Sequence, residues 1–504
     1  MVNTMTSIST YMQKNNLIVL LWSVIAGLIV YGYSIFNFTL SIDNEYLDLF
    51  EQKISIGRWG GAFLKETILP SPYAPYFTTM IFVLFLALSY YSFCQILSLS
   101  RFNSSIFCIL AMSFPSLFYQ ADFHMQSDAV SIGIFLGVLA AGLHLKSIHS
   151  LCSKKIKILL FFLSIVAYAC SISVYQSIFV TAPGVVILFY LYNTLNGNNL
   201  LNLSKFVNFI IWCVLSVVFY FLLTKLWQYV FNIAGSSYLT DQVGWGKNSL
   251  LQNINIIYFK IKALLLGRDY YGSGIFIFST ISFLLTLMFN LKENTLLKIL
   301  LLFAGLFVPF SLIIILAVDL PARTFTFQSF VYAFFIVYFL KKFETTKKYQ
   351  SISILVCVVT LWHGSYIYSR LMFSDYMSWK ADMQTANDIL LTIRNIDDNY
   401  QDGITPVYFH GALQRVNPWK PPLSDVYGYS FFSWDNGNND RIRHFYSTNM
   451  LATIKTATFN QAESAFNELS KRPSWPIKGS VFIYHGTVIV KLSNAPGYLD
   501  NLSK

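Results

Sequence analysis

The stretch Ser41–Gly61, SIDNEYLDLFEQKISIGRWGG, follows directly after the first apolar run of a 504-residue chain. It gathers four carboxylates within eleven positions and then places an arginine and a tryptophan between glycines. Charged residues make up only 12% of the chain, about half the share that is typical of soluble domains. This concentration of acids at a membrane edge therefore needs an explanation. The four acids are Asp43, Glu45, Asp48 and Glu51.

The composition around this stretch is that of a polytopic membrane protein. Hydrophobic residues make up 55% of the chain and aromatic residues 17%, more apolar surface than one or two soluble cores can bury. In a soluble protein the net charge of +11 would suggest a nucleic-acid partner. Here the basic residues lie mostly in short loops, and no basic patch is interleaved with aromatic residues. We expect membrane lipid and no nucleic acid as partners.

Eleven segments are long and apolar enough to be predicted as membrane-spanning helices. The third contains Pro115 and is short, and only Tyr175-Gln176 separates the fifth from the sixth. Those two therefore form either a tight hairpin or one broken element. The segments are roughly 17–38, 77–99, 104–120, 128–145, 157–175, 177–194, 206–231, 273–291, 296–317, 325–341 and 350–368.

The charges of the loops predict the orientation. If the N-terminus is cytoplasmic, lysine groups such as Lys154-Lys155 and Lys341-Lys342 lie in cytoplasmic loops, and most acidic loop residues lie outside. This distribution follows the positive-inside rule. Eleven spans then place the C-terminus outside. We expect a multi-pass membrane protein with a cytoplasmic N-terminus and a C-terminal domain on the outer side.

The predicted layout has two domains. Residues 1–369 form the transmembrane domain, whose first outward loop, 39–76, is amphipathic. Its apolar positions recur at near-helical spacing, which predicts one or two helices along the interface, broken near Gly57. Residues 370–504 contain more Asn, Asp, Pro and Trp and are predicted to form a small soluble α+β domain.

Within the C-terminal domain, helices are predicted at Trp379–Asn395 and Phe459–Leu469. Three short segments, ITPVYFHG, GSVFIYHG and TVIVKLS, are predicted strands, and the last two form a hairpin at His485-Gly486. The fold class is thus a polytopic α-helical membrane protein with a small α+β outer-face domain.

The first candidate catalytic residues are Asp43 and Glu45, about one turn beyond the first span. Carboxylates at a membrane boundary are costly, and they usually have a function when they face the protein interior. Partial burial raises a carboxyl pKa, which suits it to take a proton from a sugar hydroxyl. The alternative is a solvated acidic loop. Asp48 and Glu51 are interpreted as solvated helix surface.

Arg58 and Trp59 are candidates for binding a glycosyl phosphate. Arginine offers a planar fork of donors to phosphate oxygens, and tryptophan can stack on the apolar face of a pyranose. The alternative is an interfacial tryptophan anchor beside an arginine that reaches towards the headgroups.

The short outward loop between the third and fourth spans carries Asp122, His124 and Asp128. They are candidates for lining the same cavity, although a helix N-terminus alone also accounts for Asp128. We expect no cofactor; a divalent metal at His124 stays an alternative that no ligand spacing supports. Arg323, at the start of a span, either binds a lipid phosphate or pairs with Asp319. Lys491 either points at the site or ends a strand in solvent.

These residues resemble a known family. A first helix followed at once by SIDNEY, an amphipathic loop with ISIGRWGG, about ten spans and an outer soluble tail are similar to the phage-type serotype-converting O-antigen glucosyltransferases, type II-like. That family belongs to the GT-C class of polyprenyl-phosphate-sugar transferases. The resemblance covers most of the chain in layout, and in residues it depends chiefly on 41–61.

The resemblance implies transfer of glucose from undecaprenyl-phosphate-glucose to a sugar of the lipid-linked O-antigen repeat at the periplasmic face, with inversion. It implies a first-loop carboxylate as general base, here Asp43 or Glu45, and a second acid, Asp122 or Asp128. Arg58, Arg323 and Lys491 are its candidate phosphate ligands. It also implies two functional partners, a glucosyltransferase that makes the donor and a small flippase.

Two other classes remain as alternatives. A transporter or flippase of a lipid-linked sugar would need an inverted repeat and discontinuous helices. An O-antigen polymerase or ligase would carry one large outward loop between late spans, whereas here the bulk is a C-terminal tail.

Overall fold

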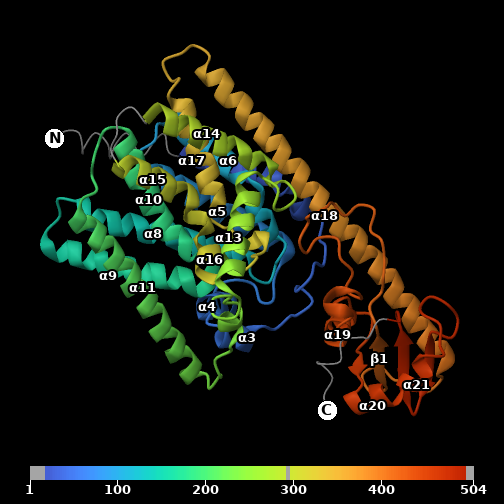
Figure 1. Ribbon diagram of the computed structural model, residues 1–504. Coiled ribbons are helices and arrows are strands. Elements are labelled where there is room, and N and C mark those ends of the chain that lie inside the picture. The colour runs from blue at the N-terminus through green and yellow to red at the C-terminus, as the bar shows by residue number, and fades with distance from the viewer. Residues whose placement is uncertain (1–16, 291–295, 495–504) are drawn as a thin grey trace. The chain divides into compact units, whose positions relative to one another are not determined.

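The computed structural model describes residues 17–290 and 296–494 (Figure 1). The first sixteen residues, for which the loop charges predict a cytoplasmic location, lie outside this range. The chain divides into two compact units. One, called the membrane unit below, comprises Met1–Asn37 and Leu49–Ser369, and the other, the C-terminal unit, comprises Phe38–Asp48 and Arg370–Lys504. The later division between the two units falls between Ser369 and Arg370, and the acidic segment Phe38–Asp48 groups with the C-terminal unit and not with the spans.

The membrane unit is built from apolar helices that pack side by side. Among the described residues, eight helices are long and apolar enough to cross a membrane, or nine if the bent pair Arg101–Met112 and Pro115–Ala121 is one span. That bend, of 41°, falls at Pro115, whose ring and missing N–H interrupt a helix. Leu17–Val30 and Gln328–Lys341 are shorter apolar helices in two other predicted spans. The structure therefore supports a polytopic protein, while the count of eleven stays a prediction.

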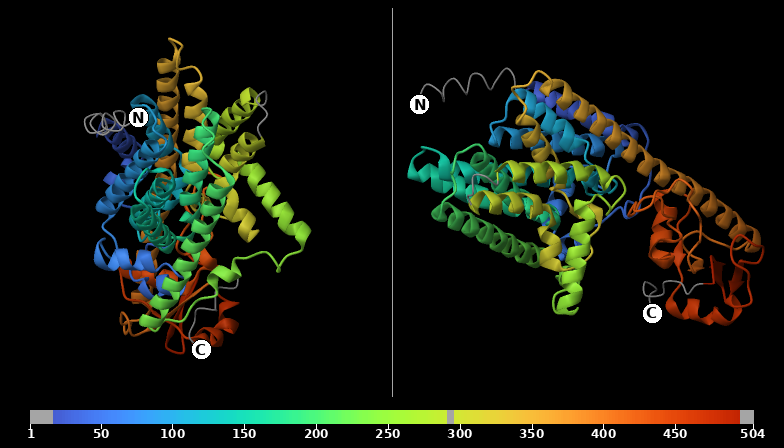
Figure 2. Two further views of the ribbon diagram at one scale, coloured as in Figure 1. Left: turned by 90° about the vertical axis from the view of Figure 1, so that its left-hand side faces the viewer. Right: turned by 45° about the horizontal axis from the view of Figure 1, so that its top comes forward.

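The helices of this unit are seen from three directions in Figures 1 and 2, and α8 packs along both α9 and α5. The longer ones are α5 (Pro75–Ile96), α6 (Arg101–Met112), α8 (Ser127–His149), α9 (Lys154–Val174), α10 (Thr181–Leu195), α11 (Leu203–Val230), α13 (Leu250–Leu265), α14 (Phe276–Asn290), α15 (Leu296–Phe307), α17 (Gln328–Lys341) and α18 (Tyr349–Ile396). The shorter ones are α2 (Gly32–Phe36), α3 (Phe50–Ser55), α4 (Trp59–Thr67), α7 (Phe118–Ala121), α12 (Tyr238–Asp241) and α16 (Ser311–Leu316).

The amphipathic loop predicted at 39–76 forms two short helices, α3 and α4, with the break at Gly57 that the sequence predicts. Gly57 has φ +81°, a conformation that favours glycine. The glycines after Trp59 let α4 approach α9 closely: a Cβ at Gly60 would lie 2.1 Å from the Ser173 hydroxyl oxygen, and one at Gly61 would lie 3.1 Å from a backbone oxygen. The run of glycines is thus explained by packing.

The helix breaks at Tyr175-Gln176, as the sequence predicts. The residues at this break contact the connection between α3 and α4. Helix α9 ends at Val174, and a 3₁₀ turn, η2 (Gln176–Val180), leads into α10. The Gln176 side chain donates to the carbonyl of Ile56 at 2.7 Å and accepts from Nε of Arg58 at 2.8 Å. Lys154–Val174 and Gln176–Leu195 are each long and apolar enough to be a separate span, which favours the hairpin alternative. The turn between them supplies polar groups that pair with the backbone and side chain of the neighbouring loop.

The C-terminal unit contains a four-stranded sheet in the order β2-β1-β4-β3. The three predicted strands form β1 (Pro406–His410), β3 (Val481–Tyr484) and β4 (Thr487–Lys491). The hairpin between β3 and β4 is confirmed, with positive φ at both His485 and Gly486, as tight hairpin turns require. Strand β1 is parallel to β4 and to the two-residue β2 (Lys455–Thr456).

Helices complete this unit. The predicted helix 379–395 is the end of α18, which runs unbroken from Tyr349 to Ile396 and is drawn orange in Figure 2. The predicted helix 459–469 divides at Ala465 into α20 (Phe459–Ser464) and α21 (Phe466–Leu469). Sequence reasoning missed α19 (Asn439–Thr448), whose N-cap Asn438 accepts from the backbone N–H of Asp440.

The core of the C-terminal unit includes two residues from the start of the chain. Leu40 and Ile42 are buried, each 1% exposed, among side chains of α18, β1, β4 and α19. The hydroxyl of Ser41, between them, donates to Asp375 of α18 at 2.5 Å. Buried apolar residues at alternate positions are typical of an extended segment. The burial of Leu40 and Ile42 attaches the acidic residues that follow them to the C-terminal unit.

Candidate active site

Asp43 lies in a tight turn of the acidic segment. The N–H of Asn44 donates to the carbonyl of Ser41 at 3.1 Å, which closes a four-residue turn. Asp43, the third residue of this turn, has φ +71°, in the left-handed region that non-glycine residues seldom adopt. Aspartate tolerates this conformation better than most residues, and such strain is concentrated at functional sites.

A single arginine, Arg441 of α19, holds the two candidate catalytic carboxylates. One terminal nitrogen, Nη1, donates to Oε1 of Glu45, and the other, Nη2, donates to Oδ1 of Asp43 at 3.1 Å. The Nη2 atom also donates to Asp435 at 2.9 Å. Asp435 itself has φ +49°. We call these four residues, Asp43, Glu45, Asp435 and Arg441, the carboxylate–arginine cluster.

The charges of this cluster do not balance. Three carboxylates surround one guanidinium whose side chain is only 6% exposed. The neighbouring carboxylates raise the pKa of Arg441, outweighing the opposing effect of its burial, so it stays charged. Charge-assisted bonds from one planar fork fix the positions of all three acids. The backbone carbonyl of Glu45 is held as well, because it accepts from the hydroxyl of Thr448 at 2.8 Å.

Glu45 and Asp43 differ sharply in exposure. The Glu45 side chain is fully buried, and burial raises its pKa to about 8 in spite of the adjacent Arg441. Its second oxygen, Oε2, has no hydrogen-bond partner among the described residues. The side chain of Asp43 is 46% exposed. Asp43 is therefore the acid that a substrate hydroxyl can reach, and Glu45 is the acid that anchors the segment.

Sequence reasoning missed Arg441. Arg443, two residues later, has the same side chain but pairs with the nearby Asp440 at 2.6 Å and is 39% exposed. Nothing local separates the two arginines. The two arginines differ in their position on α19. Arg441 is buried together with Ile442 and Phe445 on the side of the helix that faces the core, and Arg443 is not.

Arg58 and Trp59, in the membrane unit, are engaged in packing. Besides its bond to Gln176, the Arg58 guanidinium lies 4.5 Å from the ring centre of Tyr175. Trp59 is 7% exposed and stacks on Trp227 of α11, with ring centres 5.8 Å apart and planes at 12°. These contacts account for both residues by tertiary packing and leave little of Trp59 for a sugar ring.

The loop with Asp122, His124 and Asp128 lies against two buried lysines of the loop 39–76. Lys65 of α4 pairs with Asp128 at 2.8 Å, and both side chains are almost fully buried. Lys53 of α3 donates to the carbonyl of Met125 at 3.4 Å. Burial lowers the pKa of Lys53 to about 8 and the pKa of His124 to about 4. His124 is therefore neutral. Sequence reasoning did not single out either lysine.

The remaining candidates have defined surroundings. Asp319 pairs with Lys260 at 2.5 Å. The guanidinium of Arg323 lies 5.0 Å from the ring centre of Phe123, next to the 122–128 loop. Lys491, at the end of β4, is 3% exposed and donates to the carbonyls of Leu469 and Arg472, each at 2.7 Å. The ammonium of Lys491 thus provides hydrogen-bond donors for carbonyl groups at and just after the end of α21.

The candidates fall into two sets, each inside one compact unit. Asp43, Glu45 and Lys491 lie in the C-terminal unit, and the others lie in the membrane unit. Among residues 17–290 and 296–494, no three His, Cys, Asp or Glu side chains are grouped so that they could hold a metal ion.

The fold and the site define a multi-helix membrane protein whose small α/β unit holds a strained aspartate on a buried arginine. The family model for glucosyl transferase GtrII matches residues 32–340. The chain belongs to this family, the serotype-converting O-antigen glucosyltransferases. No match was found among curated proteins or solved structures. The matched range includes Asp43 and Glu45 and ends before Arg441.

Proposed function

We propose that this protein transfers a glucosyl group from undecaprenyl-phosphate-glucose to a sugar of the lipid-linked O-antigen repeat at the periplasmic face of the inner membrane. Family membership supports the glucosyl group and the O-antigen. The observation that carries the catalytic assignment is Asp43, half exposed and held in a left-handed turn by buried Arg441.

Asp43 is the proposed general base. As the acceptor oxygen attacks the anomeric carbon, its O–H bond breaks and the proton passes to the Asp43 carboxylate. The bond from the anomeric carbon to the phosphate oxygen breaks at the same time, and its electron pair leaves with the lipid phosphate. Attack from the face opposite the leaving group inverts the anomeric configuration. The reaction needs no nucleotide and no cofactor.

Glu45 and Arg441 are proposed positioning residues. The guanidinium fixes the carboxylate of Asp43 through Nη2 while Nη1 holds Glu45. Because side chains must be held within a fraction of an ångström for efficient proton transfer, a fixed base is more effective than one in a mobile loop.

Lys53 and Lys65, together with Arg323, are the proposed anion-binding residues of the membrane unit, where they suit a lipid phosphate. Lys65 has a carboxylate partner, but among the described residues Lys53 has only a long hydrogen bond, of 3.4 Å, to a carbonyl. A buried ammonium with so weak a partner suits an anionic ligand, because buried charges are costly unless paired. Arg58 and Lys491 fit this role less well, since packing contacts already engage them.

The decisive experiment is mass spectrometry of O-antigen from cells that carry the intact gene or the Asp43→Asn variant. The proposal expects one added hexose per modified repeat with the intact gene and none with the variant, at equal amounts of membrane-inserted protein. Movement of the lipid-linked sugar without a new glycosidic bond would favour the transporter alternative instead. The anomeric configuration of the added hexose, read by NMR, tests inversion.

A further inference from the structure

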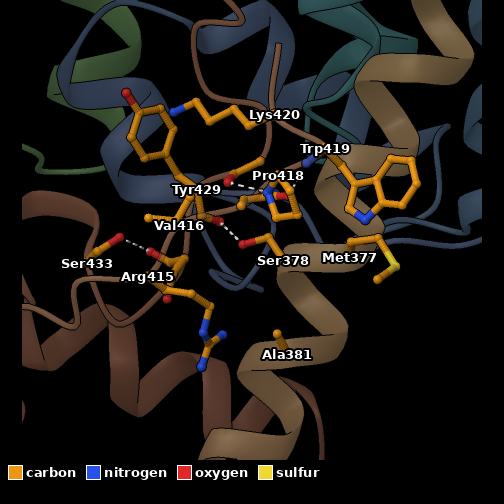
Figure 3. A pocket seen from close by; sticks show the side chains of 13 residues that line it. Met377, Ser378, Ala381, Arg415, Val416, Pro418, Trp419, Lys420, Tyr429 and Ser433 are labelled. Atoms are coloured by element: carbon orange, nitrogen blue, oxygen red, sulfur yellow. Dashed lines mark hydrogen bonds between the residues drawn. The ribbon is translucent and has the colours of Figure 1, made fainter. Parts of the chain in front are cut away.

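A pocket of about 240 Å³ opens in the C-terminal unit (Figure 3). One wall is the face of α18 that carries Met377, Ser378 and Ala381. The other walls are two loop segments, 415–420 and 428–433. None of its lining residues was singled out by the sequence patterns, and the proposed chemistry uses none of them.

Hydrogen bonds hold the walls in place. The hydroxyl of Ser378 donates to the carbonyl of Tyr429 at 2.7 Å, which ties the second loop to α18. The Asn417 amide donates to the carbonyl of Ser374 at 2.9 Å and to that of Gly428 at 3.2 Å, which ties the two loops and the helix together. The pocket is thus pre-formed, as binding sites for small ligands usually are.

Two aromatic rings border the pocket and stay open to solvent. Trp419 is 39% exposed and Tyr429 is 41% exposed. Figure 3 shows the two rings on opposite sides. The ammonium of Lys420 lies over the Tyr429 ring, 2.7 Å from its centre, and the guanidinium of Arg370 lies 5.6 Å from the ring centre of Trp419. Phe373 meets Trp419 edge-on with ring centres 4.9 Å apart, and Trp434 meets Tyr429 edge-on at 4.8 Å. These contacts hold both rings in place, and partly exposed aromatic rings are typical of recognition surfaces.

The charge around the pocket is nearly balanced. Arg415 is neutralised by Asp382 of α18 at 2.9 Å. Lys420 is the other cation in the lining, which contains no acidic residue. A strongly anionic ligand would favour several free cations. Flat apolar faces with a few polar groups at their edges suit a sugar ring instead, which presents C–H groups on its faces and hydroxyls around its rim.

The pocket is connected to the carboxylate–arginine cluster. Tyr429 contacts Trp434, and Trp434 precedes Asp435, which binds Arg441. Ser433, the last lining residue, precedes Trp434 in turn. A ligand seated between the two rings is therefore only a few side chains from the segment that carries Asp43.

We infer that this pocket is a saccharide subsite that binds one ring of the acceptor polymer. The inference rests on the proposed function for the identity of the polymer. A volume of about 240 Å³ is below the range of roughly 300–1,000 Å³ of pockets for drug-sized ligands, so it suits a single ring of a longer chain. Such a subsite binds the acceptor at a distance from the reacting hydroxyl. This binding raises selectivity for the acceptor polymer and orients the hydroxyl for its attack on the anomeric carbon.

The test measures binding of the purified full-length protein, in detergent, to O-polysaccharide released by mild acid from lipopolysaccharide of the strain that carries the gene. Isothermal titration calorimetry is expected to show that Trp419→Ala and Tyr429→Ala each weaken binding about tenfold or more. Trp419→Phe and Tyr429→Phe, which keep an aromatic face, are expected to retain most of it. Leu391→Ala, another exposed position of α18, is the matched control and is expected to bind as the wild type does.

The outcomes separate this inference from the proposed function. Asp43→Asn is expected to bind the polysaccharide normally and to transfer no glucose. If Asp43→Asn transfers glucose while Trp419→Ala loses binding, the base assignment is wrong and the subsite stands. Polysaccharide binding that neither alanine variant weakens would overturn the subsite. So would binding of inorganic phosphate or anionic phospholipid vesicles, and not of polysaccharide, that depends on Lys420.

Discussion

Arg441 donates a hydrogen bond to Glu45, a residue 396 positions earlier in the chain. This bond attaches the acidic segment to the C-terminal unit, where Leu40 and Ile42 also enter the core. The candidate catalytic carboxylates are therefore part of the C-terminal unit in structure, although in sequence they follow the first membrane helix. A change that loosens this unit is expected to misplace the base.

Replacing the proposed base tests the assignment directly. Asp43→Asn removes the proton acceptor and keeps the size of the side chain, so glucosyl transfer is expected to fall about 10²–10⁴-fold, the usual contribution of a general base. Transfer to lipid-linked acceptor in isolated membranes is the measurement. Asp48→Asn, an exposed position in the same segment, is the control and is expected to keep full activity. Equal activity in both variants would contradict the assignment.

Removing Arg441 is expected to destabilise the C-terminal unit. Arg441→Met leaves a carboxyl oxygen of buried Glu45 without its donor, and a buried polar group left unsatisfied costs about 1–3 kcal/mol of unfolding free energy. The thermal unfolding midpoint in detergent should fall accordingly. Arg443→Met, on the exposed side of α19, should change the unfolding free energy by less than about 0.5 kcal/mol.

The double variant Arg441→Met with Glu45→Gln separates charge from packing. Because no buried charge is left without its partner, it is expected to lose less stability than the two single variants added together. Strict additivity of the two losses would argue that the contact of Arg441 with Glu45 is energetically unimportant. Transfer should stay low in the double variant, since Asp43 loses its anchor.

The raised pKa of Glu45 predicts a dependence of stability on pH. In the folded protein its pKa is about 8, above the ordinary value of 4.5, so between these values the folded state binds more protons than the unfolded state. Stability linked to Glu45 is therefore full below about pH 4.5 and is lost as pH rises through 8. Thermal unfolding midpoints measured from pH 5 to 9 check this. Glu45→Gln is expected to flatten the fall, and an unchanged slope would show that other groups cause it.

Lys53 offers a test of donor-phosphate binding that does not break an ion pair. Lys53→Met removes an ammonium that donates a long hydrogen bond, of 3.4 Å, to a carbonyl and has no ion pair within the part of the chain that the structure describes. The KM for the polyprenyl-phosphate donor is expected to rise about tenfold, which is about 1.4 kcal/mol of lost binding, and the unfolding midpoint is expected to change little. Lys225→Met, an exposed lysine of α11, is the matched control. A normal KM in Lys53→Met would leave Lys65 and Arg323 as the remaining candidates.

The glycines after Trp59 are expected to be required for packing. In Gly60→Ala the new Cβ would lie 2.1 Å from the Ser173 hydroxyl oxygen and 3.3 Å from its backbone, an overpacking that costs typically about 1–3 kcal/mol. The unfolding midpoint and the yield of inserted protein should both fall. Gly32→Ala, whose added Cβ meets no heavy atom within 4 Å, should leave both unchanged.

Much of this protein was predicted from local patterns. Apolar run length located the membrane helices, because a span needs a fixed length of hydrocarbon-compatible chain. Alternating apolar residues and the His485-Gly486 turn predicted β1, β3 and β4, because strand periodicity and turn conformation are local properties. The charges of Ser41–Gly61 pointed to Asp43 and Glu45 for the same reason: a carboxylate at a membrane edge is costly wherever the rest of the chain lies.

Only the tertiary structure showed which side chains are in contact and which are buried. Arg441 and Arg443 look alike in sequence, yet one lies on the buried side of α19 and the other does not. Asp43 and Glu45 both looked suited to catalysis, and burial alone separates the reachable acid from the anchored one. No sequence pattern singled out Lys53 or Lys65, whose burial comes from tertiary packing, and the sequence left Arg58 and Trp59 open between ligand and packing roles. Burial and pairing come from segments that are hundreds of residues apart, and no local pattern records them.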